Sequence, residues 1–99
     1  MTAPLRVWAP KDPDEVAKRF IDWASHASWV EGDTIVSATF SLATAAGMSI
    51  SASTHDDHEI SIVTLTGGTA DSRGKVLCSV VTEDGQTLQQ TATILVRAR

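Results

Sequence analysis

A short tight-turn sequence, Glu83-Asp84-Gly85-Gln86, separates two runs rich in β-branched residues, Lys75–Thr82 and Leu88–Val96. An Asp-Gly pair at such a place is typical of a β-hairpin, because glycine accepts a positive φ at no steric cost. Within each run the apolar residues alternate and would share one face of a strand: Val76, Cys78 and Val80 in the first run, and Ala92, Ile94 and Val96 in the second. These residues predict an antiparallel strand pair with one buried face.

Three earlier runs are predicted strands on similar grounds, namely Thr34–Phe40, Met48–Ser53 and Ile60–Thr66. Small or polar stretches separate the runs and are predicted turns or loops: Ala43–Gly47, His55–His58 and Gly67–Gly74. Strand signals recur about every 10 to 14 residues without a convincing helix, which indicates an all-β sandwich of about six to seven antiparallel strands.

The stretch from Val16 to Trp23 fits two patterns, neither of them cleanly. As a helix it would start at an Asp14 cap, with Val16, Phe20 and Trp23 at helical spacing. As a strand it would place Val16, Lys18, Phe20 and Asp22 on one face, and Ala17, Arg19, Ile21 and Trp23 on the other. The strand is favoured, because the sequence that follows is β throughout.

The length of 99 residues allows one domain and leaves no room for two. Pro4, Pro10 and Pro13 interrupt any strand ladder near the N-terminus, so residues 1–15 are predicted to form an extended arm. The sandwich itself is expected over residues 16–99. A chain of this size buries only a modest core, so contacts with partners could contribute to its stability.

The net charge of −4 does not favour binding to nucleic acid or to anionic lipid. The sequence contains no apolar run of the roughly 18 residues that a membrane-spanning helix requires. The single cysteine, Cys78, cannot form an intrachain disulfide and is expected to be a buried, inert thiol. We therefore expect neither nucleic acid nor membrane among the partners.

Histidine and acidic clusters are the candidate chemical sites. The His55-Asp56-Asp57-His58-Glu59 stretch could bind zinc or nickel, but residues three apart on a strand point to opposite faces, so a solvated turn is the favoured interpretation. The acidic residues Asp12, Asp14, Glu15 and Asp22 lack the spacing of a calcium loop, and the neighbouring cations favour ordinary ionised surface groups.

The Gly67-Gly68-Thr69-Ala70 stretch lacks the Lys-Ser/Thr ending and the following helix of a phosphate loop, so it is read as a turn between strands. No residue is therefore predicted to be catalytic, to bind a cofactor or to hold a metal ion. The chain is not expected to be an enzyme, and binding to other proteins is the favoured function.

The three tryptophans all lie within the first 29 residues. They could simply pack one end of the core, or at least one of them could anchor an interface, where tryptophan is enriched. Trp8 is the best anchor candidate. The predicted interface residues are Trp8, Pro10, Lys11, Asp12 and Trp29.

Several stretches resemble the bacteriophage fiber-tail adaptor family. The most specific are Trp8–Val16, Ile21–Trp23 and Gly32–Ile35. Further matches follow in the same order: Ser37–Phe40, Ala46–Met48, Leu65–Ala70 and Val80–Thr87. The resemblance covers residues 8 to 96, with departures at Lys18-Arg19, Ala45 and Thr64.

The resemblance implies an Ig-like sandwich that serves as a structural protein of the phage particle, in its tail or neck, and joins tail or neck proteins to fibers. Its implied partners are other phage structural proteins and copies of itself in a symmetric assembly, put together in the cytoplasm of the bacterial host. A capsid decoration protein is an alternative, as is a host-surface or carbohydrate-binding module of the same fold.

The arm is the predicted attachment device. We expect residues 1–15, anchored by Trp8, to lie against a neighbouring subunit instead of folding back wholly on their own sandwich, because a proline-stiffened arm loses less entropy on binding. The alternative is that Trp8 packs on its own domain near Trp23.

Overall fold

A computed structural model of the chain describes residues 6–56 and 58–98. The described residues are almost wholly strand and turn, and they contain no α-helix. The elements in chain order are β1 (Arg6–Val7), β2 (Ala17–Asp22), the short 3-10 turn η1 (Trp23–Ser25), β3 (Ile35–Thr44), β4 (Met48–His55), β5 (Ile60–Gly67), β6 (Ser72–Thr82) and β7 (Thr87–Val96).

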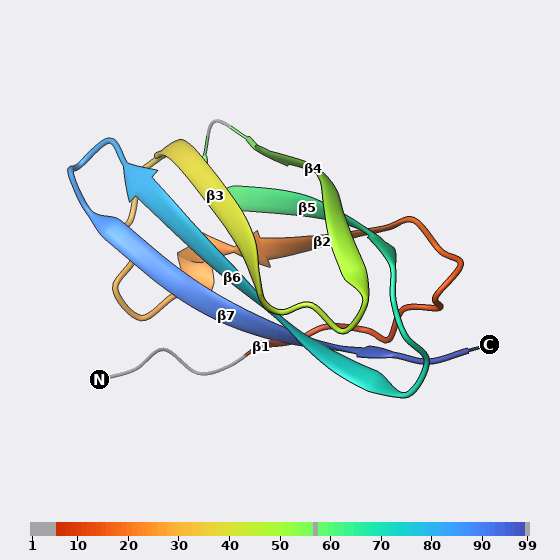
Figure 1. The fold of residues 1–99 in the computed structure, drawn as a ribbon. Coiled ribbons are helices and arrows are strands. Elements are labelled where there is room, and N and C mark those ends of the chain that lie inside the picture. The colour runs from red at the N-terminus through yellow and green to blue at the C-terminus, as the bar shows by residue number, and fades with distance from the viewer. Residues whose placement is uncertain (1–5, 57, 99) are drawn as a thin grey trace.

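The strands form two sheets that pack against each other (Figure 1). One sheet has the strand order β1-β7-β6-β3 and the other has the order β2-β5-β4. In an Ig-like sandwich the second, fifth and fourth strands face the third, sixth and seventh, and this arrangement is present here. The prediction of an all-β, Ig-like sandwich is confirmed. The short β1 differs from the rest, because it runs parallel to its neighbour β7 while the other pairs are antiparallel.

The β6–β7 hairpin forms where the Asp-Gly pair predicts it. Gly85 has φ of 89°, a left-handed conformation that glycine adopts without strain. The turn is closed by the Thr82 N–H, which donates to the Gln86 carbonyl at 2.9 Å. The predicted apolar faces are also observed, since these side chains are fully buried: Val76, Cys78, Val80, Ala92, Ile94 and Val96.

The core lies between the sheets in two clusters. The first contains Ile21 and Trp23 from one layer against Ile35, Cys78, Val80 and Leu88 from the other. The second contains Met48, Val63 and Leu65 against Val76, Ile94 and Val96. Trp23 is completely buried, and its indole Nε1 donates to the Ser61 hydroxyl at 2.9 Å. The Ser61 hydroxyl thus satisfies the only polar atom of the buried Trp23 side chain. The same hydroxyl lies 3.6 Å from the Cys78 sulfur.

The ambiguous stretch after residue 15 is a strand, as favoured. In β2 the buried Ala17 and Ile21 alternate with the exposed Lys18 and Phe20, and β2 pairs with β5 over its whole length. The alternation continues to Trp23, which is buried on the same side as Ile21. The η1 turn begins there, where the Asp22 carboxylate accepts a hydrogen bond from the Ala24 N–H.

The prediction of a loop from Gly67 to Gly74 is wrong in its second half, because β6 already begins at Ser72. Gly74 is a buried strand residue, and a Cβ atom there would lie 2.4 Å from the Met48 terminal methyl. Glycine at this point therefore permits close packing of the two sheets and does not mark a chain reversal. A sequence pattern alone does not distinguish these two uses of glycine.

The buried Cys78 thiol gives a direct test of this core. Burial raises the pKa of Cys78 to about 11, with a smaller opposing effect from the Ser61 hydroxyl. The thiolate is the reactive form, so we expect folded protein at pH 8 to resist a thiol reagent and denatured protein to react at once. Because the folded pKa is raised, the stabilising contribution of the neutral thiol is present below pH 9 and is lost as the pH rises toward 11. Rapid labelling of the folded protein at pH 8 would contradict this packing.

Candidate protein-interaction site

The first described segment lies on its own domain. Residues Arg6 and Val7 pair in parallel with Ala92 and Thr93 of β7, and the Trp8 N–H donates to the Thr93 carbonyl at 2.9 Å. Further along, Lys11 forms a parallel bridge with Val96. The prediction that this segment lies against a neighbouring subunit instead is therefore wrong for residues 6–11, and residues 1–5 lie outside the described part of the chain. Prolines did not prevent pairing, because the N–H groups that pair belong to Trp8 and Lys11.

Lys11 is a core residue of this segment and has no exposed surface. Its ammonium donates to the Gly67 carbonyl at 2.6 Å and to the Asp12 carbonyl at 2.8 Å. Since Gly67 ends β5 in the opposite layer, the Lys11 side chain connects the two sheets. Lys11 was predicted to be an interface residue, and its burial was not predicted. Lysine is rarely buried unless its charge is paired or satisfied by hydrogen bonds.

Trp8 packs partly buried against both core clusters, one of which contains Trp23. Its indole Nε1 donates to the Phe20 carbonyl at 3.1 Å, on the outer edge of β2. Arg19 makes the reverse connection, because its guanidinium donates to the carbonyls of Ala9 and Pro10. The alternative in which Trp8 packs on its own domain is thus the observed one.

The remaining predicted interface residues lie at two separate places. Pro10 is exposed beside Lys11, and Asp12 is half-buried in a turn where its carboxylate accepts a hydrogen bond from the Asp14 N–H. Trp29 is far from both in the sequence, in the loop between η1 and β3, and packs half-buried against the first core cluster. The structure therefore brings Trp8, Pro10, Lys11 and Asp12 into one strip and leaves Trp29 elsewhere.

Exposed apolar side chains that were not predicted as a site border this strip. Val7 is 82% exposed and Phe20 is 60% exposed. Both line a groove of about 740 Å³ between the edges of β1 and β2, with Trp8, Lys18, Asp22 and His26 along it. The signal that could have found this surface is the alternation in β2, which places an aromatic residue between Lys18 and Asp22 on the solvent face.

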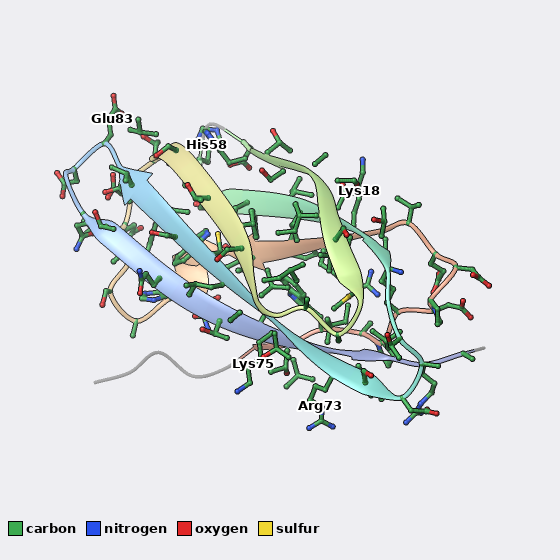
Figure 2. All side chains as sticks on the ribbon, viewed as in Figure 1. Lys18, His58, Arg73, Lys75 and Glu83 are labelled. Carbon is green, nitrogen blue, oxygen red and sulfur yellow. The ribbon has the colours of Figure 1, made fainter. Side chains whose placement is uncertain are left out.

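One end of the sandwich is acidic. The loops between η1 and β3, between β4 and β5, and between β6 and β7 meet there: the Ile35 N–H donates to the His58 carbonyl and the Glu83 N–H donates to the Thr34 carbonyl, both at 2.9 Å. Their described acidic residues are Glu31, Asp33, Asp56, Glu59, Glu83 and Asp84, and these loops contain no lysine or arginine. The described Lys and Arg side chains belong to the first segment, β2, β6 and the C-terminal residues (Figure 2).

Two of these carboxylates also hold the loops in place. Burial acts to raise the pKa of Asp33, but hydrogen bonds from the Thr82 side chain and from the N–H groups of Thr34 and Asp84 bring it below its ordinary value. Burial likewise acts to raise the pKa of Asp56, and the N–H groups of Ile60 and His58 together with the charge of His58 lower it. The charged form of both carboxylates is therefore the one that fits the fold.

Neither a metal-binding cluster nor a membrane-spanning helix is formed by the described residues. No three His, Cys, Asp or Glu side chains among them gather as a metal ion would require. The part of the chain that the structure describes contains no helix long and apolar enough to cross a membrane. The described surfaces include an apolar groove, an acidic end and an opposite end that carries lysines and arginines among acidic residues.

A known protein family identifies what kind of protein carries these surfaces. The model of the family described as "Podophage GP4 fiber-tail adaptor protein gp77" matches residues 11–95. The chain belongs to this family. It is a structural component of the phage particle that serves as a tail adaptor to fibers, and it is not an enzyme. No curated protein matches the chain.

Trp8, as part of the strip, should contribute measurably to the stability of this fiber-tail adaptor. We expect Trp8→Ala to lower the free energy of unfolding by about 2 kcal/mol, because the change removes half-buried apolar surface and the bond to the Phe20 carbonyl. Val7→Ala is the matched control, because Val7 is highly exposed. This variant should change the free energy of unfolding by less than about 0.5 kcal/mol. Urea unfolding measures both. Equal stability of the two variants would show that Trp8 does not hold the segment.

The Asp33 carboxylate predicts a particular pH dependence for the same adaptor. Because its folded pKa is lowered, its contribution to stability is present above about pH 4 and is lost as the pH falls through the folded value. We expect Asp33→Asn to lower the melting temperature at pH 7 and to have little effect at pH 3. The control Glu31→Gln removes a charge from the same end and should show no such difference. A constant effect of Asp33→Asn across this range would contradict the assignment.

Proposed function

We propose that the fiber-tail adaptor joins its partners through the two ends of its sandwich, one partner at each end. The observation that carries the proposal is the uneven distribution of cations along the molecule. The loops of the acidic end contain no lysine or arginine, whereas the opposite end carries charges of both signs: Lys18, Arg73 and Arg97 together with Asp12, Asp14, Glu15 and Asp71. Arg73 stands at the start of β6 and Glu83 directly follows its last residue. Ten residues of strand at about 3.3 Å each separate the two by roughly 33 Å. Figure 2 places Glu83 and His58 toward one end, and Lys18 and Arg73 toward the other.

Different chemistry at the two ends suits a protein that must distinguish two partners. Charged surfaces select complementary surfaces and reject like-charged ones, so a partner that matches the acidic end differs from one that matches the mixed charges of the opposite end. The predicted interface residues divide between the ends under this proposal. Trp29 would contact a partner at the acidic end, whereas Pro10 and Asp12 would do so at the opposite end. Lys11 would act by holding the strip, since it is buried.

The proposal extends to where and how the protein assembles. We propose a position in the tail or neck of the particle, with assembly in the cytoplasm of the bacterial host. Several copies would associate in a symmetric arrangement, which is the usual organisation of repeated small subunits. The family match favours this tail role over capsid decoration or sugar binding.

Charge reversal at each end tests the proposal. The variant Glu31→Lys/Asp84→Lys alters the acidic end, and Arg73→Glu/Arg97→Glu alters the other; each of these side chains is exposed. We expect one variant to be absent from purified phage particles. The other should be incorporated into particles that lack fibers. Gel analysis and electron microscopy of particles assembled with each variant would measure this.

A variant that adds one charge away from the ends provides the control. Thr91→Lys alters the middle of β7, and the particles should carry both adaptor and fibers at the normal level. Circular dichroism of each purified variant shows that the sandwich is intact. The proposal is wrong if both end variants are incorporated and carry fibers normally.

A further inference from the structure

The outer face of the β2-β5-β4 sheet is nearly uncharged. The register of the strands places Phe20 beside Ile62, with Thr54 next across the sheet. Along β2, Lys18 and Asp22 flank Phe20 on the same face, because side chains two apart in a strand point the same way. Phe20, Ile60 and Ile62 line an apolar hollow beside Lys18.

Phe20 is unusual on this face. It is 60% exposed and belongs to both the apolar hollow and the groove bordered by Val7 and Trp8. Isolated apolar side chains are common on protein surfaces, but a contiguous patch on a small domain indicates an interaction surface. An aromatic residue at the centre of such a patch is typical of a residue that dominates binding.

The β2 edge of the same sheet is partly blocked against strand addition. β2 is an edge strand, and the carbonyl of Phe20 on its open side accepts a hydrogen bond from the Trp8 indole. The Lys18 carbonyl accepts from the Arg19 guanidinium at 2.9 Å. These side chains occupy two main-chain acceptors that a new strand would use along β2, which disfavours strand addition beside Phe20 and leaves the face of the sheet as the route for a partner there.

The order of side chains on this face is complementary to itself. We infer that a second copy of the chain docks on it, face to face, across a twofold axis that passes near Phe20. When the two β2 strands run in opposite directions, Lys18 of each copy faces Asp22 of the other, and the two Phe20 rings meet at the centre. Opposite charges facing each other stabilise such a pairing, and a twofold interface requires one surface to match itself.

The charges also select the direction of the axis. An axis along the strands would place Lys18 opposite Lys18 and Asp22 opposite Asp22, which is unfavourable, whereas an axis across the strands places unlike charges together. Phe20 supplies most of the binding, and the charged pairs supply the register. The inference deepens the self-association included in the proposed function and identifies the surface that mediates it.

The size of the face sets the expected affinity. β4 and β5 each contain 8 residues, so at about 3.3 Å per residue and about 4.8 Å between strands the face measures roughly 26 Å by 14 Å. This is smaller than the roughly 800 Å² per partner of a standard interface. We expect a weak dimer with a dissociation constant on the order of 0.1 mM, and attachment of both copies to one particle would raise its occupancy.

Single and mixed charge reversals test the pairing by sedimentation equilibrium of purified protein at up to millimolar concentration. Lys18→Glu places like charges opposite each other at both contacts, so its dimer should weaken at least about tenfold. Asp22→Lys should do the same. An equimolar mixture of the two variants restores both unlike pairs and should form a mixed dimer. Lys75→Glu is the matched control, because Lys75 projects from the other layer on the opposite side of the molecule (Figure 2), and should dimerise normally.

A covalent test remains valid if Asp22→Lys fails to fold, which its bond to the Ala24 N–H makes a concern. In Thr54→Cys, which keeps Phe20, the two introduced thiols lie near the axis because Thr54 is in the same row across the sheet as Phe20 and Ile62. Mild oxidation should therefore link most of the protein as a disulfide dimer. Lys75→Cys is the control and should stay largely monomeric. The native Cys78 is buried and does not interfere.

Self-association through this face and attachment through the two ends are tested by different measurements. A mixed dimer and selective cross-linking at position 54 support this self-association. A wild-type protein that is monomeric at millimolar concentration, or a dimer unaffected by Lys18→Glu, overturns it. Attachment through the two ends is measured in particles with end variants, so it can succeed or fail independently of this result.

Discussion

A few side chains join the two sheets along one open side of the sandwich, and much of the surface described above depends on them. Lys11 reaches from an isolated bridge with Val96, at the end of β7, to the last residue of β5. Trp8 and Arg19 make reciprocal contacts between the first segment and β2. Without these contacts the edge of β2 would present free main-chain groups, and such an edge invites uncontrolled pairing with other strands. With them, the β2 edge presents side chains where its carbonyls would otherwise be free.

Sequence reasoning predicted the elements whose information is local. The Asp84-Gly85 turn and the alternation around Cys78 each specify a structure within a few residues, and both were confirmed. The strand at Phe20 was also identified, although its apolar pattern is imperfect. Burial against a second sheet determined that stretch more than its own propensity did.

The errors share a different physical origin. Lys11 and Gly74 were misplaced because their environments come from residues far away in the sequence, the Gly67 carbonyl in one case and the Met48 methyl in the other. The acidic end could not be predicted from any single loop, since its charge depends on distant loops meeting. Of the predicted interface residues, Trp8 and Lys11 have clear structural roles, and the most exposed aromatic residue, Phe20, was recognised only as part of a strand.

The parallel pairing of β1 with β7 has a mechanical consequence. The chain enters β1 from the side of the β6–β7 turn and leaves β7 at the far end, so the two described ends of the chain point in opposite directions (Figure 1). A force applied between these ends pulls the two strands past each other. The bonds that join them, from Trp8 to Thr93, from Lys11 to Leu95 and from Arg97 to Lys11, then carry the load together in shear instead of opening one after another. A small domain connected in this way resists stretching along its long axis better than its modest core would suggest.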